Sequence, residues 1–178
     1  MSGDLPIAPT MPPRIALVAH DHKKHDLLEW CQANREALSG ARLVATGTTG
    51  RLLAEALDLE IERLHSGPLG GDLQIGAQIA EGTVDLLLFF WDPLEPQPHD
   101  PDVRALLRVA VVWNVPVACD LATADLVITS PLFGSRHRRV PDEAAARGEA
   151  PGSGRVGAEQ LAALRAAPES DGPPVTAP

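Results

Sequence analysis

Lysine, cysteine and long apolar runs are all scarce in this chain of 178 residues. Its 15 basic residues include only two lysines, Lys23 and Lys24, and its two cysteines, Cys31 and Cys119, form no CxxC pair. Two isolated thiols exclude a disulfide framework, so we expect buried thiols in a reducing cytoplasm. No apolar stretch approaches the ~20 residues that span a bilayer, and we expect no signal peptide.

Positive charge is also in short supply, since the formal net charge is −9. A chain of this charge is a poor partner for nucleic acid or an anionic membrane, and neither is expected to bind. An anionic small molecule would have to be held by a local cluster of positive groups. The apolar fraction of 44% is enough for one hydrophobic core, so the length predicts a single domain with appendages.

The two ends of the chain differ in composition from its middle. Residues 1–13 contain four prolines and show no periodicity, which predicts a flexible leader. From residue 134 onward Pro, Gly and Ala dominate, and residues 134–178 are expected to be a largely mobile tail with a weak helix over 157–167. The catalytic or binding domain is therefore predicted to span residues 14–133.

Within that domain, short apolar runs alternate with amphipathic segments. Strands are predicted at 15–19, 41–45, 61–64, 84–91 and 115–119. Helices are predicted over 23–38, from the turn at 46–50 to 57, and over 72–81, 102–113 and 122–130. Five such alternations predict an α/β fold with three layers, in which helices cover both faces of an open, mainly five-stranded parallel sheet. Ligands of such sheets bind beyond the carboxyl ends of the strands.

The polar residues that stand out all follow predicted strands. These segments are 20–24 (HDHKK), 46–50 (TGTTG), 66–72 (SGPLGGD), Asp92 and 99–102 (HDPD). The TGTTG turn is neither a P-loop nor GxGxxG, but its amides and hydroxyls can hold a phosphate. Lys24, Ser66 and Gly67 can complete that site; the alternatives are an ordinary turn and a surface lysine.

Several of these residues are candidates for acid–base chemistry: Asp72, Asp92, His99 and Asp102. Each also has a structural interpretation, because Asp72 can cap a helix, Asp92 can form a turn, Asp102 falls in a first helical turn and His99 can be exposed. Their convergence on one sheet edge favours function. His20 and His22 form an HxH pair that suggests a metal, but the chain has too few strands for the barrel that uses it, and a metal-free site is preferred.

These motifs resemble methylglyoxal synthase. The resemblance extends from about residue 14 to 133 and rests on 45–50 (ATGTTG), 66–72 (SGPLGGD), 89–94 (FFWDPL) and 98–103 (PHDPDV). It implies a cytoplasmic, cofactor-free and metal-independent lyase that removes phosphate from dihydroxyacetone phosphate, a glycolytic bypass. It also implies a homohexamer, with inorganic phosphate as product and possible inhibitor.

The resemblance assigns a role to each matching residue. Asp72 is implied to be the base that removes the C3 proton, with His99 and Asp102 assisting at the substrate oxygens. The substrate-binding set implied is His20, Lys24, Thr46, Gly47, Thr48, Thr49, Ser66 and Gly67, and Asp21 and Asp92 are implied to support the pocket. On sequence alone, a metabolite-sensing domain of the same fold and a triose-phosphate isomerase-type activity stay open as alternatives.

The chain departs from the family at one position. Longer members carry a C-terminal arginine that enters the neighbouring subunit's site, shortly after an apolar-Pro-Asp step. Here residues 140–142 (VPD) supply the step, but Ala145 stands where the arginine is expected and Arg147 follows two positions later. Weakened regulation by phosphate is therefore expected.

Overall fold

The computed structural model describes residues 12–96 and 98–133, and within them five parallel strands form one sheet with the order β3-β2-β1-β4-β5. The strands are β1 (Arg14–Ala19), β2 (Arg42–Ala45), β3 (Ile61–Arg63), β4 (Leu86–Phe90) and β5 (Val117–Ala118). The sequence-predicted sheet is therefore confirmed. The predicted leader, the tail and its helix, and the residues of the C-terminal departure lie largely or wholly outside the described residues.

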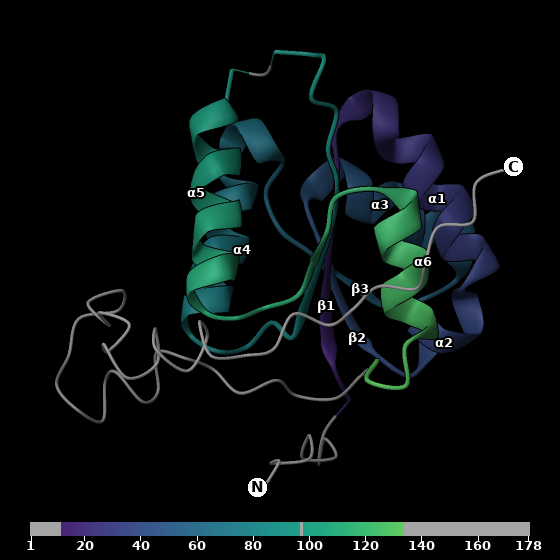
Figure 1. Cartoon of the computed structure of the whole chain (residues 1–178). Coiled ribbons are helices and arrows are strands. Elements are labelled where there is room, and N and C mark those ends of the chain that lie inside the picture. The colour runs from purple at the N-terminus through teal and green to yellow at the C-terminus, as the bar shows by residue number, and fades with distance from the viewer. Residues whose placement is uncertain (1–11, 97, 134–178) are drawn as a thin grey trace, which may run out of the picture.

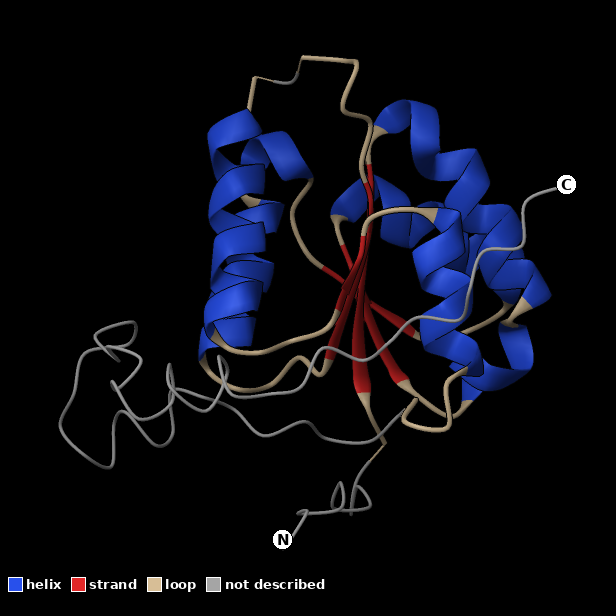
Figure 2. Ribbon diagram, in the orientation of Figure 1, coloured by secondary structure: helices blue, strands red, loops and turns tan. Residues whose placement is uncertain are grey.

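Helices cover both faces of this sheet (Figures 1 and 2). On one side lie α1 (Lys24–Ala33), α2 (Arg35–Ser39), α3 (Gly47–Leu57) and α6 (Leu121–Thr129), and on the other lie α4 (Gly71–Ala80) and α5 (Asp100–Val112). Two short 3-10 helices, η1 (Asp21–Lys23) and η2 (Gly67–Leu69), precede α1 and α4. The predicted three-layer α/β/α architecture is thus present.

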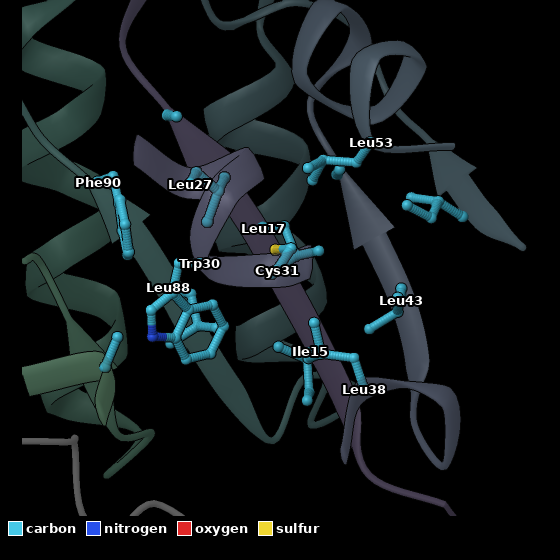
Figure 3. Close-up of a cluster of buried hydrophobic side chains, with 14 of the residues drawn as sticks. Ile15, Leu17, Leu27, Trp30, Cys31, Leu38, Leu43, Leu53, Leu88 and Phe90 are labelled. Atoms are coloured by element: carbon cyan, nitrogen blue, oxygen red, sulfur yellow. The ribbon is translucent and has the colours of Figure 1, made fainter. Parts of the chain in front are cut away.

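The alternation of side chains along β1 divides the core into two clusters. Ile15 and Leu17 pack under α1, α2, α3 and α6, whereas Ala16 and Val18 pack under α4 and α5. Figure 3 shows the first cluster, where Leu27 and Cys31 of α1 lie over the sheet. Strands buried on both faces read as continuous apolar runs, which is why the sequence located them.

The prediction of one continuous helix over residues 23–38 is wrong, because this segment forms two helices, α1 and α2. The side-chain amide of Asn34 donates to the Trp30 carbonyl oxygen at 2.9 Å, and its backbone leaves helical geometry at φ −108° and ψ 19°. Asparagine competes in this way with the backbone ladder. The chain turns there into α2, which brings Leu38 into the core.

Two other predicted boundaries also differ from the structure. Helix α5 begins at Asp100 and not at residue 102, because proline is tolerated in a first helical turn and Pro101 occupies it. Strand β5 is two residues long, whereas five were predicted. Pro116 limits the strand, because proline has no N–H to donate and only its carbonyl oxygen takes part, accepting from Leu87 N–H at 3.0 Å.

The expectation of buried thiols is confirmed for Cys31, whereas Cys119 follows the end of β5 and is only half-buried. Cys31 is fully buried, and neither cysteine is in a disulfide within the described residues. Burial in apolar surroundings raises the pKa of the Cys31 thiol to about 12, so this thiol acts as a core side chain.

Candidate active site

A pocket opens at the carboxyl edge of the sheet, near the point where the chain leaves β1 and β4 towards opposite faces. Central strands that diverge in this way leave a crevice between their loops. The pocket is lined by side chains and backbone from the loops after β1, β2, β3 and β4: Val18, Ala19, His20, Asp21, Lys24, Thr46, Thr48, Ser66, Gly67, Pro68, Asp72 and His99. The predicted convergence of these four loops on one edge is therefore observed.

One side of the pocket carries its positive charge. The Lys24 ammonium donates to Thr48 Oγ1 at 2.7 Å and to the exposed Asp21 carboxylate at 2.5 Å. These two bonds use two of its three N–H donors and aim the ammonium at the first turn of α3. Thr46 is the N-cap of α3 but makes no side-chain capping bond. A helix N-terminus beside an ammonium is suited to a phosphate.

The loop after β3 is held between α3 and α4 by hydrogen bonds of the His65 backbone. Gly47 N–H donates to the His65 carbonyl oxygen at 3.0 Å, and His65 N–H donates to Gln74 Oε1 at 2.8 Å. A Cβ on Gly47 would lie 3.1 Å from Ser66 N, and one on Gly71 would clash with the His65 carbonyl oxygen. The glycines therefore permit close approach of two loops, and Ser66 and Gly67 are brought into the same pocket as Lys24 and Thr48.

The other side of the pocket holds a buried carboxylate and an imidazole. Asp72 is 2% exposed, and its Oδ2 lies 3.5 Å from His99 Nε2. Its Oδ1 and His99 Nδ1 are buried and have no hydrogen-bond partner among the described residues. Asp72 is not the helix cap that the structural interpretation offered, because Gly70 occupies the N-cap with φ +92° and Asp72 lies two residues further on. The carboxylate is thus available to a ligand.

Burial raises the pKa of Asp72 above its usual range, against the lowering influence of His99 and His20. The nearby Asp102 carboxylate adds to the increase. Desolvation disfavours the charged form of a carboxyl group and makes its conjugate base stronger. In the chain without ligand, burial therefore outweighs the two histidines, and Asp72 is a stronger base than an exposed aspartate.

His20 is held by the backbone of the β4 loop. Its Nδ1 accepts a hydrogen bond from Asp92 N–H at 3.3 Å, and its ring packs edge-on against Phe89 with centroids 5.3 Å apart. A neutral imidazole that accepts at Nδ1 carries its proton at Nε2. His20 Nε2 is buried and has no partner among the described residues, so it presents a donor to the pocket.

The remaining predicted residues lie around the pocket. Thr49 is buried and its hydroxyl has no partner within the described residues, but it does not line the pocket. Asp102 is half-buried in the first turn of α5, where its N–H donates to the His99 carbonyl oxygen, and it also lies outside the lining. Asp92 accepts from Leu94 N–H through Oδ1, so its turn-forming role is present.

The HxH pair does not converge on one point. His20 is buried beside Asp92 N–H, whereas His22 is exposed and faces the Asp92 and Glu95 carboxylates. Sequence reasoning did not single out Gln74, Glu95 or the apolar lining residues Val18 and Ala19. The sequence gives no sign of the apolar pair besides its place at the end of a strand. Gln74 does not line the pocket and contributes only by accepting the hydrogen bond from His65 N–H.

Comparison with known proteins places this geometry in a family. A family model described as "MGS-like domain" matches residues 26–119. A methylglyoxal synthase from Pseudoalteromonas atlantica is 62% identical over 130 residues, which are 72% of this chain and 96% of that protein. One from Coxiella burnetii is 56% identical over 135 residues, which are 75% of this chain and 94% of that protein.

A solved structure agrees with these sequence matches. The crystal structure of methylglyoxal synthase from Elizabethkingia anophelis superposes with a TM-score of 0.66 at 54% identity, covering 70% of this chain and 84% of that one. In the part of the chain that the structure describes, none of the helices is both long and apolar enough to cross a bilayer. By sequence and by structure, this chain belongs to the methylglyoxal synthase family.

Proposed function

We propose that the chain is a carbon–oxygen lyase that converts dihydroxyacetone phosphate into methylglyoxal and inorganic phosphate through an enediolate. The observation that carries the proposal is the buried Asp72 carboxylate, which lies in the same small pocket as the Lys24–Thr48 pair. Its pKa is raised, and one of its oxygens has no hydrogen-bond partner among the described residues. Relatives that are 56–62% identical bear the name of this enzyme. That name favours the lyase over a sensing domain or an isomerase.

In the first step the Asp72 carboxylate takes a proton from C3, the carbon that carries the substrate hydroxyl. The electron pair of the C–H bond forms a C2–C3 double bond and the carbonyl oxygen becomes an enediolate oxygen. His20 Nε2–H and His99 are placed to stabilise that oxygen or to move protons between the two oxygens. Fixed donors aimed at developing charge usually contribute the largest share of a rate enhancement.

In the second step the C1–O bond breaks and the phosphate leaves with its electron pair. The resulting enol takes up a proton at carbon and becomes methylglyoxal. In this proposal the residues that bind the substrate phosphate form the phosphate side of the pocket: Lys24, Thr46, Gly47, Thr48, Thr49, Ser66 and Gly67. Elimination requires the C–O bond to align with the enediolate π system, so these groups decide between elimination and the return of the proton that an isomerase performs.

Asp102, Asp21 and Asp92 have indirect roles in this proposal. Asp102 raises the pKa of Asp72, and its N–H in the first turn of α5 donates to the carbonyl oxygen of His99, the N-cap of that helix. Asp21 orients the Lys24 ammonium, and Asp92 fixes His20 through its backbone N–H. The reaction as written needs no metal and no organic cofactor, because a carboxylate supplies the base and imidazole donors stabilise the oxyanion.

Wider properties of the chain belong to the same proposal. We assign the catalytic domain to residues 14–133, its location to the cytoplasm and its assembly to a homohexamer, with inorganic phosphate as a product that competes for the phosphate side. Light scattering coupled to size exclusion tests the assembly, since a hexamer has six times the chain mass of 18.8 kDa. A monomer or dimer at micromolar concentration would overturn the assembly but not the activity.

The decisive experiment follows two products from one substrate. Purified, EDTA-treated protein is incubated with dihydroxyacetone phosphate, and dicarbonyl and inorganic phosphate are measured together. We expect both to appear in equal amounts. Glyceraldehyde 3-phosphate without phosphate release would identify an isomerase, and no turnover by a folded sample would sink the enzyme hypothesis.

A further inference from the structure

Three metal-ligating side chains meet at the rim of the pocket, outside its lining. His22 comes from η1 after β1, and Asp92 and Glu95 come from the connection between β4 and α5, at the top of Figure 1. His22 Nδ1 lies 3.0 Å from Glu95 Oε2 and 3.5 Å from Asp92 Oδ2, and one ligand atom from each residue lies within 4.8 Å of the others. The catalytic scheme uses neither His22 nor Glu95.

The orientation of Asp92 does not depend on His22. Its Oδ1 accepts from Leu94 N–H at 3.0 Å and its own N–H donates to His20, so the remaining oxygen, Oδ2, faces the His22 ring. Only 14% of the Asp92 side chain is exposed. This carboxylate oxygen is therefore held in place before any ligand arrives.

Glu95 and His22 are close enough for an ion pair but form no hydrogen bond. Glu95 Oε2 is shielded from solvent and accepts no hydrogen bond from the described residues, although His22 Nδ1 is 3.0 Å away. The distance alone would suit a hydrogen bond. A cation between the two atoms would satisfy both.

The spacing and chemistry of the ligands select the class of ion. Zinc bonds to nitrogen and oxygen of about 2.0–2.2 Å at tetrahedral angles separate neighbouring ligand atoms by about 3.3–3.6 Å. The observed 3.0 and 3.5 Å lie close to that range. An imidazole with two carboxylates suits zinc and similar transition metals, whereas magnesium and calcium prefer oxygen ligands throughout.

We propose that His22, Asp92 and Glu95 form a rim site for a divalent transition-metal ion of the zinc class, with a fourth position open to solvent. The ion links the loops after β1 and β4, which the Asp92–His20 hydrogen bond and the edge-on contact of His20 with His99 also join. It takes no part in the reaction. A ligand that binds only the folded chain raises its melting temperature, so occupancy stabilises this edge of the sheet.

The test is a calorimetric titration of the full chain with Zn²⁺ after removal of metals with a chelator. We expect one ion per chain, a higher melting temperature with Zn²⁺ and much weaker binding of Mg²⁺. His22→Asn and Glu95→Gln should each weaken Zn²⁺ binding at least about tenfold while the melting temperature without metal stays unchanged. His25→Asn is the matched control, because it removes another exposed histidine that pairs with a carboxylate, Glu29 at 3.5 Å.

Each outcome has a stated meaning. Loss of binding in both rim variants but not in His25→Asn supports the site. Affinity that is unchanged in either His22→Asn or Glu95→Gln overturns the three-ligand assignment, and so does the absence of any heat with the unaltered chain. The titration needs no substrate, so its failure is distinguishable from a failure of the proposed lyase activity.

Discussion

The two sides of the pocket differ in how much of their polar surface is already paired. On the phosphate side, Lys24 donates to Thr48 and Asp21 without any ligand. On the acid–base side, formed by His20, Asp72 and His99, each residue keeps one buried polar atom that has no partner among the described residues. A buried polar atom without a hydrogen bond lowers the stability of the fold. The acid–base side therefore destabilises the chain when no ligand is bound, whereas the Lys24 bonds of the phosphate side do not.

This difference separates the expected effects of substitution. A substrate phosphate must compete with bonds that Lys24 already makes, so the phosphate side contributes mainly to binding. A substrate carbonyl and C–H group meet His20 Nε2, Asp72 Oδ1 or His99 Nδ1, which have no partner in the described part of the chain, so the acid–base side contributes mainly to the rate. Thr49 is the exception on the phosphate side, because its buried hydroxyl has no partner within residues 12–96 and 98–133.

The largest expected effect comes from Asp72→Asn, which removes the base and keeps the shape. The turnover number should fall by at least about 10²–10⁴-fold, the usual contribution of a positioned base. Binding of inorganic phosphate, measured by calorimetry, should stay within a few-fold. Turnover within tenfold of the unaltered enzyme would remove Asp72 as the base, and loss of phosphate binding would show that the two sides are not separate.

The next effect tests the spacing within the acid–base side. In Gly67→Ala the added Cβ would lie 2.8 Å from His99 Nε2 and 3.1 Å from Asp72 Oδ2, so the imidazole must move. A displacement on this scale costs up to about 10²-fold in turnover.

Gly76→Ala is the control for this substitution, since its Cβ on the same side of the sheet would come no closer than 4.0 Å to Leu106. Steady-state kinetics and circular dichroism of both variants measure the difference. Equal activity of the two alanine variants would contradict the contact.

Lys24→Met should act on binding more than on rate. The loss of a hydrogen bond from a charged group costs about 1.5–3 kcal/mol, which predicts a KM that rises about 10–100-fold. Lys23→Met is the matched control, because Lys23 is adjacent to Lys24 in sequence but lies outside the pocket lining and pairs with Asp26 at 3.2 Å. A kcat that falls as much as KM rises would place Lys24 on the acid–base side.

The smallest effect is on stability and depends on pH. Because burial raises the Asp72 pKa in the folded chain, the charged carboxylate destabilises the fold above that raised pKa, and the cost vanishes below the unfolded value. Asp72→Asn should therefore raise the melting temperature at pH 7, by about 2–4 °C for each kcal/mol, and less at pH 4. Thermal scans at both pH values measure it. An equal or lower melting temperature at pH 7 would mean that the His99 contact outweighs burial.

Much of the fold followed from short-range patterns. Continuous apolar runs located the strands, and the parallel order then brought four loops to one edge. The break at Asn34 was missed because a side-chain bond to Trp30 decides it, and amphipathic periodicity continues across that bond. The start of α5 was missed because Pro101 was interpreted as the end of a loop, while proline also suits a first helical turn.

The site was predictable as a set of residues but not as an arrangement. Nothing in the spacing of Asp72 and His99 states that they lie 3.5 Å apart, since the contact joins α4 to the start of α5. The burial that raises the Asp72 pKa and the proton position of His20 both depend on neighbours from other strands. Glu95 belongs to no recognisable motif, and only its contact with His22 in the folded chain makes it a candidate metal ligand.

The short outer strands described above have a consequence for assembly. The two edges of the sheet are β3, with three residues, and β5, with two. Strands of this length present few unpaired backbone groups to another chain, a common protection against edge-to-edge aggregation. Any association between copies through the described residues must therefore rely on side chains of helices and loops, and a continuous sheet shared between subunits is disfavoured.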